Sequence, residues 1–395
     1  LRLLGISMLP LSLSTVLNGY FIARRKASYN AFLQVFEMTA RISFITLLLH
    51  FMLPRGLESG CMARVLGGVL AEIGSFAFFF ALFVVQKGKE KRKKQKANAA
   101  VLKDLASVAM PIAASAYVRS GLLTLEHALI PVKIEQSGRS RKEAVADYGV
   151  LQGMALPIVL YPTAILYAVS GLLIPEFAER GSMGRHDAVR SLCRTVLRFT
   201  AMFGFGCALV MAVFGEQLGT LIYRSSVAGQ YVWALAPLLP VMFLDHMTDA
   251  MLKGLGEQVW TMWVNIADAV ISVVLVILLL PVFGAKGYIL VIILAEILNF
   301  SLSFGRLLWK VKVKIYAFDF LLCPLLSAAL AAMLTKSLLP DQGIGGVWQM
   351  ALRIAFSIGA YGICWYTLSF CEKKYLQNPQ RKPKKERFMH KNALL

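Results

Sequence analysis

The stretch AFLQVFEMTARISFITLLLHFML, residues 31–53, decides the fold class of this 395-residue chain. An apolar helix of about 20 residues crosses the roughly 30 Å hydrocarbon core of a bilayer. Within it, Gln34, Glu37 and Arg41 share one helix face because they stand three and then four residues apart. This polar stripe predicts either a site that faces a cavity, or a packed Glu37–Arg41 pair that neutralises itself.

The composition indicates that the whole chain, like residues 31–53, is built for a membrane. Hydrophobic residues make up 57%, the mean hydropathy is +0.63 and only 16% of residues are charged, against about 25% in soluble domains. Apolar runs recur without the alternation expected of barrel strands. We predict an all-α integral membrane protein with about eleven transmembrane helices, at 3–23, 31–53, 61–86, 105–131, 149–175, 196–222, 229–252, 259–281, 285–307, 316–339 and 347–370. Pro157, Pro162 and Pro175 predict a kink in the fifth of them.

The basic residues predict an orientation. The net charge of +20 gathers in short segments such as KGKEKRKKQK (87–96) and KKYLQNPQRKPKKER (373–387). Segments of this kind are typical of cytoplasmic loops and attract anionic lipids. We do not expect nucleic-acid binding because no stacking platform accompanies the charge. Segment 87–104 carries eight Lys and Arg against four in 132–148, so we expect the tail inside and residue 1 outside.

Enzyme and metal motifs do not stand out. The six cysteines form no CxxC pair, and HExxH, GxSxG and phosphate-loop patterns are absent from the sequence. We expect no metal, no cofactor and no enzymatic activity. The chain begins with Leu1 inside an apolar run, so we expect no signal peptide and a start within a longer protein.

An internal repeat links the two halves of the chain. At an offset of 231 residues, Asn18 aligns with Asp249, and in the following helix Gln34 and Glu37 align with Asn265 and Asp268. One offset shared by two helices suggests two homologous lobes in parallel orientation around a central cavity.

Further charged residues interrupt the predicted spans. Arg119 and Glu126 stand seven residues apart on one face, and Asp245 and Asp249 stand four apart. Two acids at that spacing disfavour each other's ionisation, so one of them can hold a proton. This favours a coupling proton or cation, with the alternative that Asp249 simply reaches the membrane interface.

Several motifs together carry a family resemblance. LSTVLNGYF, QVFEMTAR, LEHALIPVKI, YGVLQGMALPIVLYPTAI, LLIPEFAE and LKGLGEQ occur in the order seen in the polysaccharide-biosynthesis branch of the multidrug/oligosaccharidyl-lipid/polysaccharide (MOP) exporter superfamily. The chain resembles the stage V sporulation protein B type and related lipid II flippases over residues 1–310, and more loosely to 370.

The resemblance implies a fourteen-helix, MATE-like fold of two six-helix lobes and two extra helices, of which this chain would hold helices four to fourteen. The implied domains are 1–86 (second half of the first lobe), 87–104 (basic cytoplasmic linker), 105–307 (second lobe), 308–370 (two additional helices) and 371–395 (basic cytoplasmic tail).

The implied function is to flip an undecaprenyl-pyrophosphate-linked saccharide, such as a peptidoglycan precursor, across the bacterial plasma membrane by alternating access. Arg41 and Arg119, with Gln34, are then the candidate headgroup site because arginine suits phosphate oxygens. The candidate cavity and ion-coupling residues are Glu37, Glu126, Asp245, Asp249, Asp268 and Asn265, with a proton or sodium ion as partner. The run SVVLVILLLP (272–281) is apolar after Ser272 where many relatives carry an Asn, which weighs against a sodium site on that helix.

Two other functions remain open. A drug or cation antiporter of the multidrug and toxin extrusion type shares the fold but prefers acids and aromatics in its cavity, with few arginines. A membrane glycosyltransferase would need a large outer loop with catalytic acids, whereas the longest outer loop, 132–148, is short.

Overall fold

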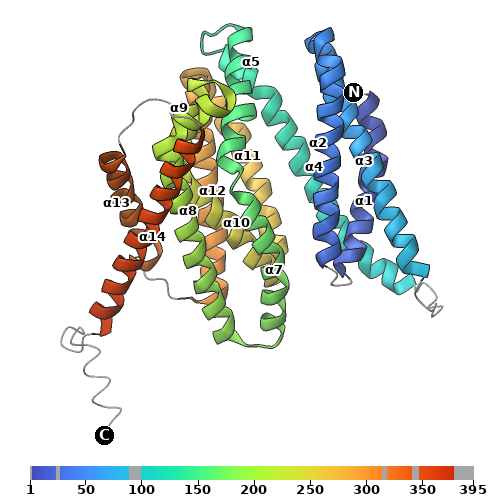
Figure 1. Cartoon of the computed structure of the whole chain (residues 1–395). Coiled ribbons are helices and arrows are strands. Elements are labelled where there is room, and N and C mark those ends of the chain that lie inside the picture. Colours follow the sequence, from blue (N-terminus) through green and yellow to red (C-terminus); the bar gives the residue numbers. More distant parts are fainter. Residues whose placement is uncertain (1, 24–26, 89–98, 314–317, 340–346, 378–395) are drawn as a thin grey trace. The chain divides into compact units, whose positions relative to one another are not determined.

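The computed structural model describes residues 2–23, 27–88, 99–313, 318–339 and 347–377. Within these ranges the ordered elements are all helical and no strand occurs, which confirms the predicted all-α membrane fold. The chain divides into two compact units, residues 1–101 and 102–395. Figure 1 shows the helices of each unit, and each unit is described by itself.

The first unit consists of three long helices, α1 (Arg2–Ala23), α2 (Ala27–Met52) and α3 (Leu57–Gly88). Helix α3 packs against both α1 and α2. Gly67 permits the close α2–α3 approach, because a Cβ there would lie 2.8 Å from the Cα of Ile45. Phe36 and Phe78 stack across the same interface with their ring centroids 4.3 Å apart.

The second unit holds the remaining helices. They are α4 (Ala99–Glu135), α5 (Arg141–Val150), α6 (Leu156–Leu160), α7 (Thr163–Ser182), α8 (His186–Tyr223), α9 (Ser226–Leu235), α10 (Leu239–Gly254), α11 (Gln258–Phe283), α12 (Ala285–Val311), α13 (Cys323–Leu338) and α14 (Val347–Gln377), with π-helical turns at Leu151–Ala155 and Phe318–Leu322.

Each of the eleven predicted spans coincides with one helix or with a series of broken helices. Among the described residues, nine helical stretches are long and apolar enough to cross a membrane; they match the predicted spans except 3–23 and 105–131, and the match to 149–175 is shifted to Arg141–Leu160. The predicted kink is present: the π-helical turn precedes α6, and the helix breaks at Tyr161 and Pro162, whereas Pro175 lies inside α7. The predicted linker falls largely in residues 89–98 and the tail in 378–395, outside the described residues.

Helix α10 lies at the centre of the second unit. It packs against α7, α8 and α12, and two glycines bring it close to its neighbours. A Cβ at Gly204 of α8 would lie 2.8 Å from the Cα of Pro240, and one at Gly254 would lie 2.7 Å from the carbonyl oxygen of Ile174. Large aliphatic side chains point outward instead, such as Leu278 at 61% and Ile363 at 68% exposure. Outward-facing aliphatic residues are expected of helices that face lipid.

An ion-pair cluster joins the start of α11 to the end of α12. The Glu257 carboxylate accepts hydrogen bonds from Arg306 and Lys310. The Arg306 guanidinium lies between Trp260 and Trp309, at 4.8 and 4.5 Å from their ring centroids. Hydrogen bonds from Lys310 and Arg306 hold the pKa of Glu257 below its usual range. The charged form of Glu257 therefore stabilises the packing of these two helix ends.

We expect Glu257→Gln to lower the free energy of unfolding by about 2 kcal/mol at pH 7, because charged hydrogen bonds are lost. Since the folded pKa is lowered, this contribution is fully present above the unfolded pKa of about 4.3 and is lost progressively as pH falls through the lower folded pKa. Thermal unfolding of the detergent-purified protein at pH 7 and at about pH 2 measures the difference. An equal melting difference at both pH values would contradict the assignment to this carboxylate.

Candidate functional site

A polar ladder connects α10 and α12 in the second unit. Asp245 and Asp249 stand one turn apart on α10 and are buried, with 8% and 9% exposure. The side-chain amide of Asn299 donates to Asp245 at 2.9 Å, and the Ser303 hydroxyl donates to Asp249 at 2.9 Å. Both partners lie on α12 and are also four residues apart. The two helices therefore meet through two polar pairs, Asp245–Asn299 (the upper rung) and Asp249–Ser303 (the lower rung).

The lower rung, at Asp249, is fully bonded. Besides Ser303 on one oxygen, its other oxygen accepts a hydrogen bond of 3.2 Å from the amide of Asn265 on α11. The Lys253 ammonium lies 3.9 Å away. Burial and these three partners do not fit the alternative that Asp249 merely reaches the interface. Asp249 and Asn265, which were predicted separately as cavity and ion-coupling residues, are thus in direct contact.

The upper rung, at Asp245, has free acceptors. Within the described part of the chain, Oδ1 of Asp245 and Oδ1 of Asn299 have no hydrogen-bond partner, although both are buried. The Thr248 hydroxyl, on a fully buried residue, also lacks one. Unpaired buried oxygen atoms are costly, and a proton on the carboxylate or a small cation would satisfy these acceptors.

Helix α4 brings a second acid and an open base towards α11. Glu126 is 6% exposed, and its carboxylate interacts electrostatically with Asp268 of α11. Asp268 also interacts with the guanidinium of Arg119, which is exposed. Over the described residues, Arg119 makes no salt bridge within 4.0 Å. Arg119 is therefore an exposed base that interacts electrostatically with the half-buried carboxylate of Asp268.

Electrostatic interactions join these acids into one group. Asp245 interacts with Glu296 and Asp268 as well as with its neighbour on α10. An excess of carboxylates in a membrane-spanning bundle must be neutralised by protons or cations, because ionised groups are costly there. The group among the described residues comprises the acids Glu126, Asp245, Asp249, Asp268 and Glu296 and the bases Arg119 and Lys253.

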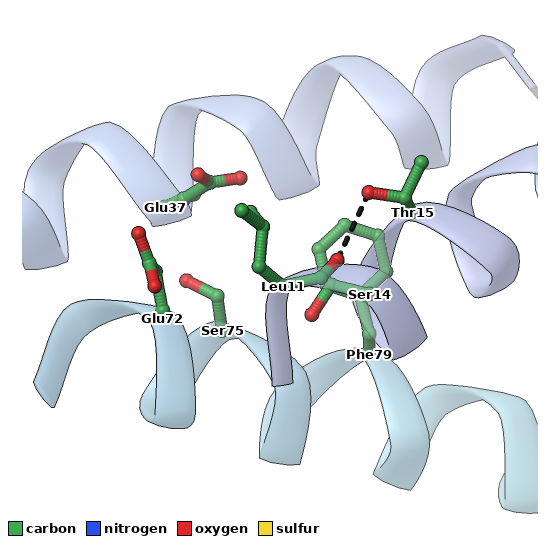
Figure 2. Close-up of a pocket in the computed structure, with 7 residues that line it drawn as sticks. All are labelled: Leu11, Ser14, Thr15, Glu37, Glu72, Ser75 and Phe79. Carbon is green, nitrogen blue, oxygen red and sulfur yellow. Dashed lines mark hydrogen bonds between the residues drawn. The ribbon is translucent and has the colours of Figure 1, made fainter. Parts of the chain in front are cut away.

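The stripe in residues 31–53 forms a separate site in the first unit. Arg41 makes a 3.0 Å ion pair with Glu37 on α2 and lies 3.8 Å from Glu72 on α3. The two acids, together with Ser75, surround a pocket of about 60 Å³, as Figure 2 shows. Two acids against one arginine leave room for one proton or monovalent cation.

The contacts of Arg41 favour the pairing alternative over an open phosphate site. Its guanidinium is shared between two acids, whereas Arg119 is open. The structure does not describe the side chain of Gln34, the third residue of the predicted headgroup site. The same holds for Asn18 of the repeat. Arg41 and Arg119 lie in different units, so the predicted headgroup site that combines them with Gln34 stays a prediction.

Sequence reasoning missed several members of these sites, among them Glu296 and Lys253 of the acidic group. Asn299 and Ser303 repeat the four-residue spacing of Asp245 and Asp249, a signal that was available but unremarkable among the small polar residues of an apolar helix. Glu72 interrupts a span, yet only the packing of α2 on α3 brings it to Arg41. Ser75 follows it by three residues and lines the same pocket.

The MatE family profile matches residues 137–278. The chain is 25% identical to stage V sporulation protein B of Bacillus subtilis (strain 168) over 333 residues, which cover 81% of this chain and 64% of that protein. It is 21% identical to sporulation protein YkvU of the same organism, with coverage of 79% and 71%. The chain thus spans somewhat less than two thirds of the length of the first of these relatives.

Two solved structures share the fold at 14% sequence identity. For the lipid II flippase MurJ in an inward closed conformation the TM-score is 0.61. The match covers 94% of this chain and 74% of the MurJ chain. An outward-facing multidrug resistance MATE family transporter of the MOP superfamily has a TM-score of 0.57, with coverage of 76% and 66%.

Together, fold and matches define an all-helical, multi-pass membrane protein that shares its fold with the two transport proteins named above. The predicted resemblance to the MOP exporter superfamily, and within it to stage V sporulation protein B, is confirmed.

Proposed function

We propose that this chain acts as a flippase that moves an undecaprenyl-pyrophosphate-linked saccharide from the inner to the outer leaflet of the bacterial plasma membrane. The observation that carries the proposal is the exposed Arg119, which interacts electrostatically with Asp268, within the group of acids that includes the buried Glu126. The likeness to stage V sporulation protein B and to the fold of a lipid II flippase supports it.

The chemistry of the cargo suits this arrangement. A pyrophosphate carries negative charge on pairs of non-bridging oxygen atoms, which the planar guanidinium can bind with two parallel hydrogen bonds. Nearby carboxylates would repel it unless they are neutralised, so binding of the cargo and binding of a proton or cation are linked through the same group. This linkage is what an alternating-access carrier requires.

A drug or cation antiporter is the second candidate. The excess of carboxylates in the second unit favours it, as does the MatE match over residues 137–278. Arg119 discriminates between the two functions, because an anionic headgroup needs this base whereas a cationic drug is repelled by it.

We expect Arg119→Ala, in the complete gene product, to abolish complementation of a lipid II flippase defect at unchanged membrane abundance. Arg119→Lys should restore complementation in part, since a point charge loses the bidentate geometry. The matched control is Arg141→Ala, an exposed arginine at the start of α5. Full complementation by Arg119→Ala would remove this residue from the headgroup site.

Orientation is a separate part of the proposal. Residues 136–140, between α4 and α5, and residues 183–185, between α7 and α8, lie at opposite ends of the second unit (Figure 1). The basic-segment asymmetry puts the second turn and the C-terminus in the cytoplasm. In a cysteine-free background, an impermeant thiol reagent added to whole cells should label Gln136→Cys and not Met183→Cys. The reverse pattern would invert the topology.

A further inference from the structure

A pocket of about 520 Å³ lies between α8 and α14, away from the polar ladder on α10. Its volume falls in the range of about 300–1,000 Å³ that is usual for ligand sites. The side chains that define it are Arg194, Arg198 and Phe199 from α8 and Trp365, Ser369 and Phe370 from α14. One wall is therefore cationic and the other walls are largely aromatic.

The arginine at the centre of the pocket is held in place. The Arg198 guanidinium donates a hydrogen bond of 2.6 Å to the hydroxyl of Ser369, which is only 6% exposed. Its Cζ lies 5.3 Å from the ring centroid of Trp365. Arg194 stands one turn earlier on the same face of α8 and is exposed. The pocket thus presents one oriented guanidinium and one accessible guanidinium together.

The pocket lies where the uncharged part of each helix ends. On α8, residues 199–215 contain no charged side chain, and on α14 the same is true of residues 354–371. Each stretch is close to the length needed to cross the hydrocarbon core. Arg194 and Arg198 precede the first stretch, so they lie at the headgroup level of one leaflet. Trp365 and Tyr366 are residue types enriched at that level.

We propose that this pocket binds an anionic phospholipid of the inner leaflet, with its phosphate on Arg194 and Arg198 and an acyl chain along Phe199 and Phe370. Charge complementarity selects an anionic headgroup, and the aromatic wall at the hydrocarbon boundary selects a lipid over a soluble anion. The site is separate from the acids on α10, α11 and α12, and it serves the chain whatever cargo those acids help to move. The assignment to the inner leaflet rests on the proposed orientation.

The test is native mass spectrometry of the purified full chain titrated with phosphatidylglycerol or with phosphatidylcholine of the same acyl chains. We expect tighter retention of phosphatidylglycerol, and a loss of about fivefold in affinity for each of Arg194→Gln and Arg198→Gln. Arg198→Lys should lose less than Arg198→Gln, because the charge remains. The matched control is Arg180→Gln, which removes an arginine that pairs with Glu176 at the end of α7.

Four other outcomes would contradict the phospholipid site. Equal retention of the two phospholipids, or an equal effect of Arg180→Gln, would overturn it. Displacement of phosphatidylglycerol by glycerol 3-phosphate at similar concentration would show a soluble-anion site instead. Preferential retention of a polyprenyl phosphate would make the pocket a cargo site. Because retention is measured without transport, failure here is distinguishable from failure of the proposed flippase activity.

Discussion

Glu126→Gln is expected to abolish transport while binding of the saccharide lipid is retained. Glu126 is nearly fully buried on α4 and interacts with Asp268 of α11. An alternating-access carrier needs a group whose charge state is bound differently in its inward and outward states. Glutamine fixes the uncharged form, so one conformation would be favoured permanently. Binding and transport are measured separately in proteoliposomes across pH and sodium concentration.

Glu135→Gln is the matched control for this prediction. It is the last residue of the same helix, α4, and lies outside the acidic group, so it should leave transport unchanged. If Glu126→Gln transports at the parent rate with the parent's ion dependence, coupling does not pass through Glu126.

The second large effect is expected at the upper rung of the ladder. Asp245→Asn should reduce the transport rate about 100-fold, the factor that corresponds to about 3 kcal/mol for a charged hydrogen-bonding group. Asp245 has a free buried oxygen, as does its partner Asn299, and the substitution removes the charge that would hold a proton or cation there. The rate should also lose its dependence on pH or sodium.

The lower rung separates transport from stability. Both oxygens of Asp249 accept hydrogen bonds, from Ser303 and Asn265. Asp249→Asn presents an NH₂ group to one of these donors, so we expect it to cost about 2 kcal/mol of stability. Asp187→Asn, at an exposed site with 96% of its side chain accessible, is the control for both variants. A large transport loss in Asp249→Asn without destabilisation would contradict this division of roles.

The fold class and the positions of the spans could be predicted because bilayer thickness fixes helix length and composition. The break near Pro162 was equally predictable, since proline removes a backbone donor. The π-helical turn at Leu151–Ala155 was not predictable, because a backbone bulge of this kind has no composition that distinguishes it from the flanking helix.

The sites were predictable only in part. Buried acids such as Asp245 and Asp249 stand out in apolar spans because their cost demands a reason. Their partners do not stand out, since Asn299 and Ser303 are ordinary in a membrane helix and are chosen by the register of α12 on α10. The same argument applies to Arg41. Its position four residues after Glu37 predicted that ion pair, but only the packing of α2 on α3 brings Glu72 close to it.

We propose that the cargo is a lipid-linked saccharide rather than a drug. Proteoliposomes that contain the complete gene product and a labelled undecaprenyl-pyrophosphate-linked saccharide test this, with an impermeant reagent that modifies the saccharide only from outside. We expect modification to proceed beyond the fraction already in the outer leaflet, and Arg119→Ala to prevent this. Modification that stops at the outer-leaflet fraction, together with export of a cationic dye, would contradict the proposal.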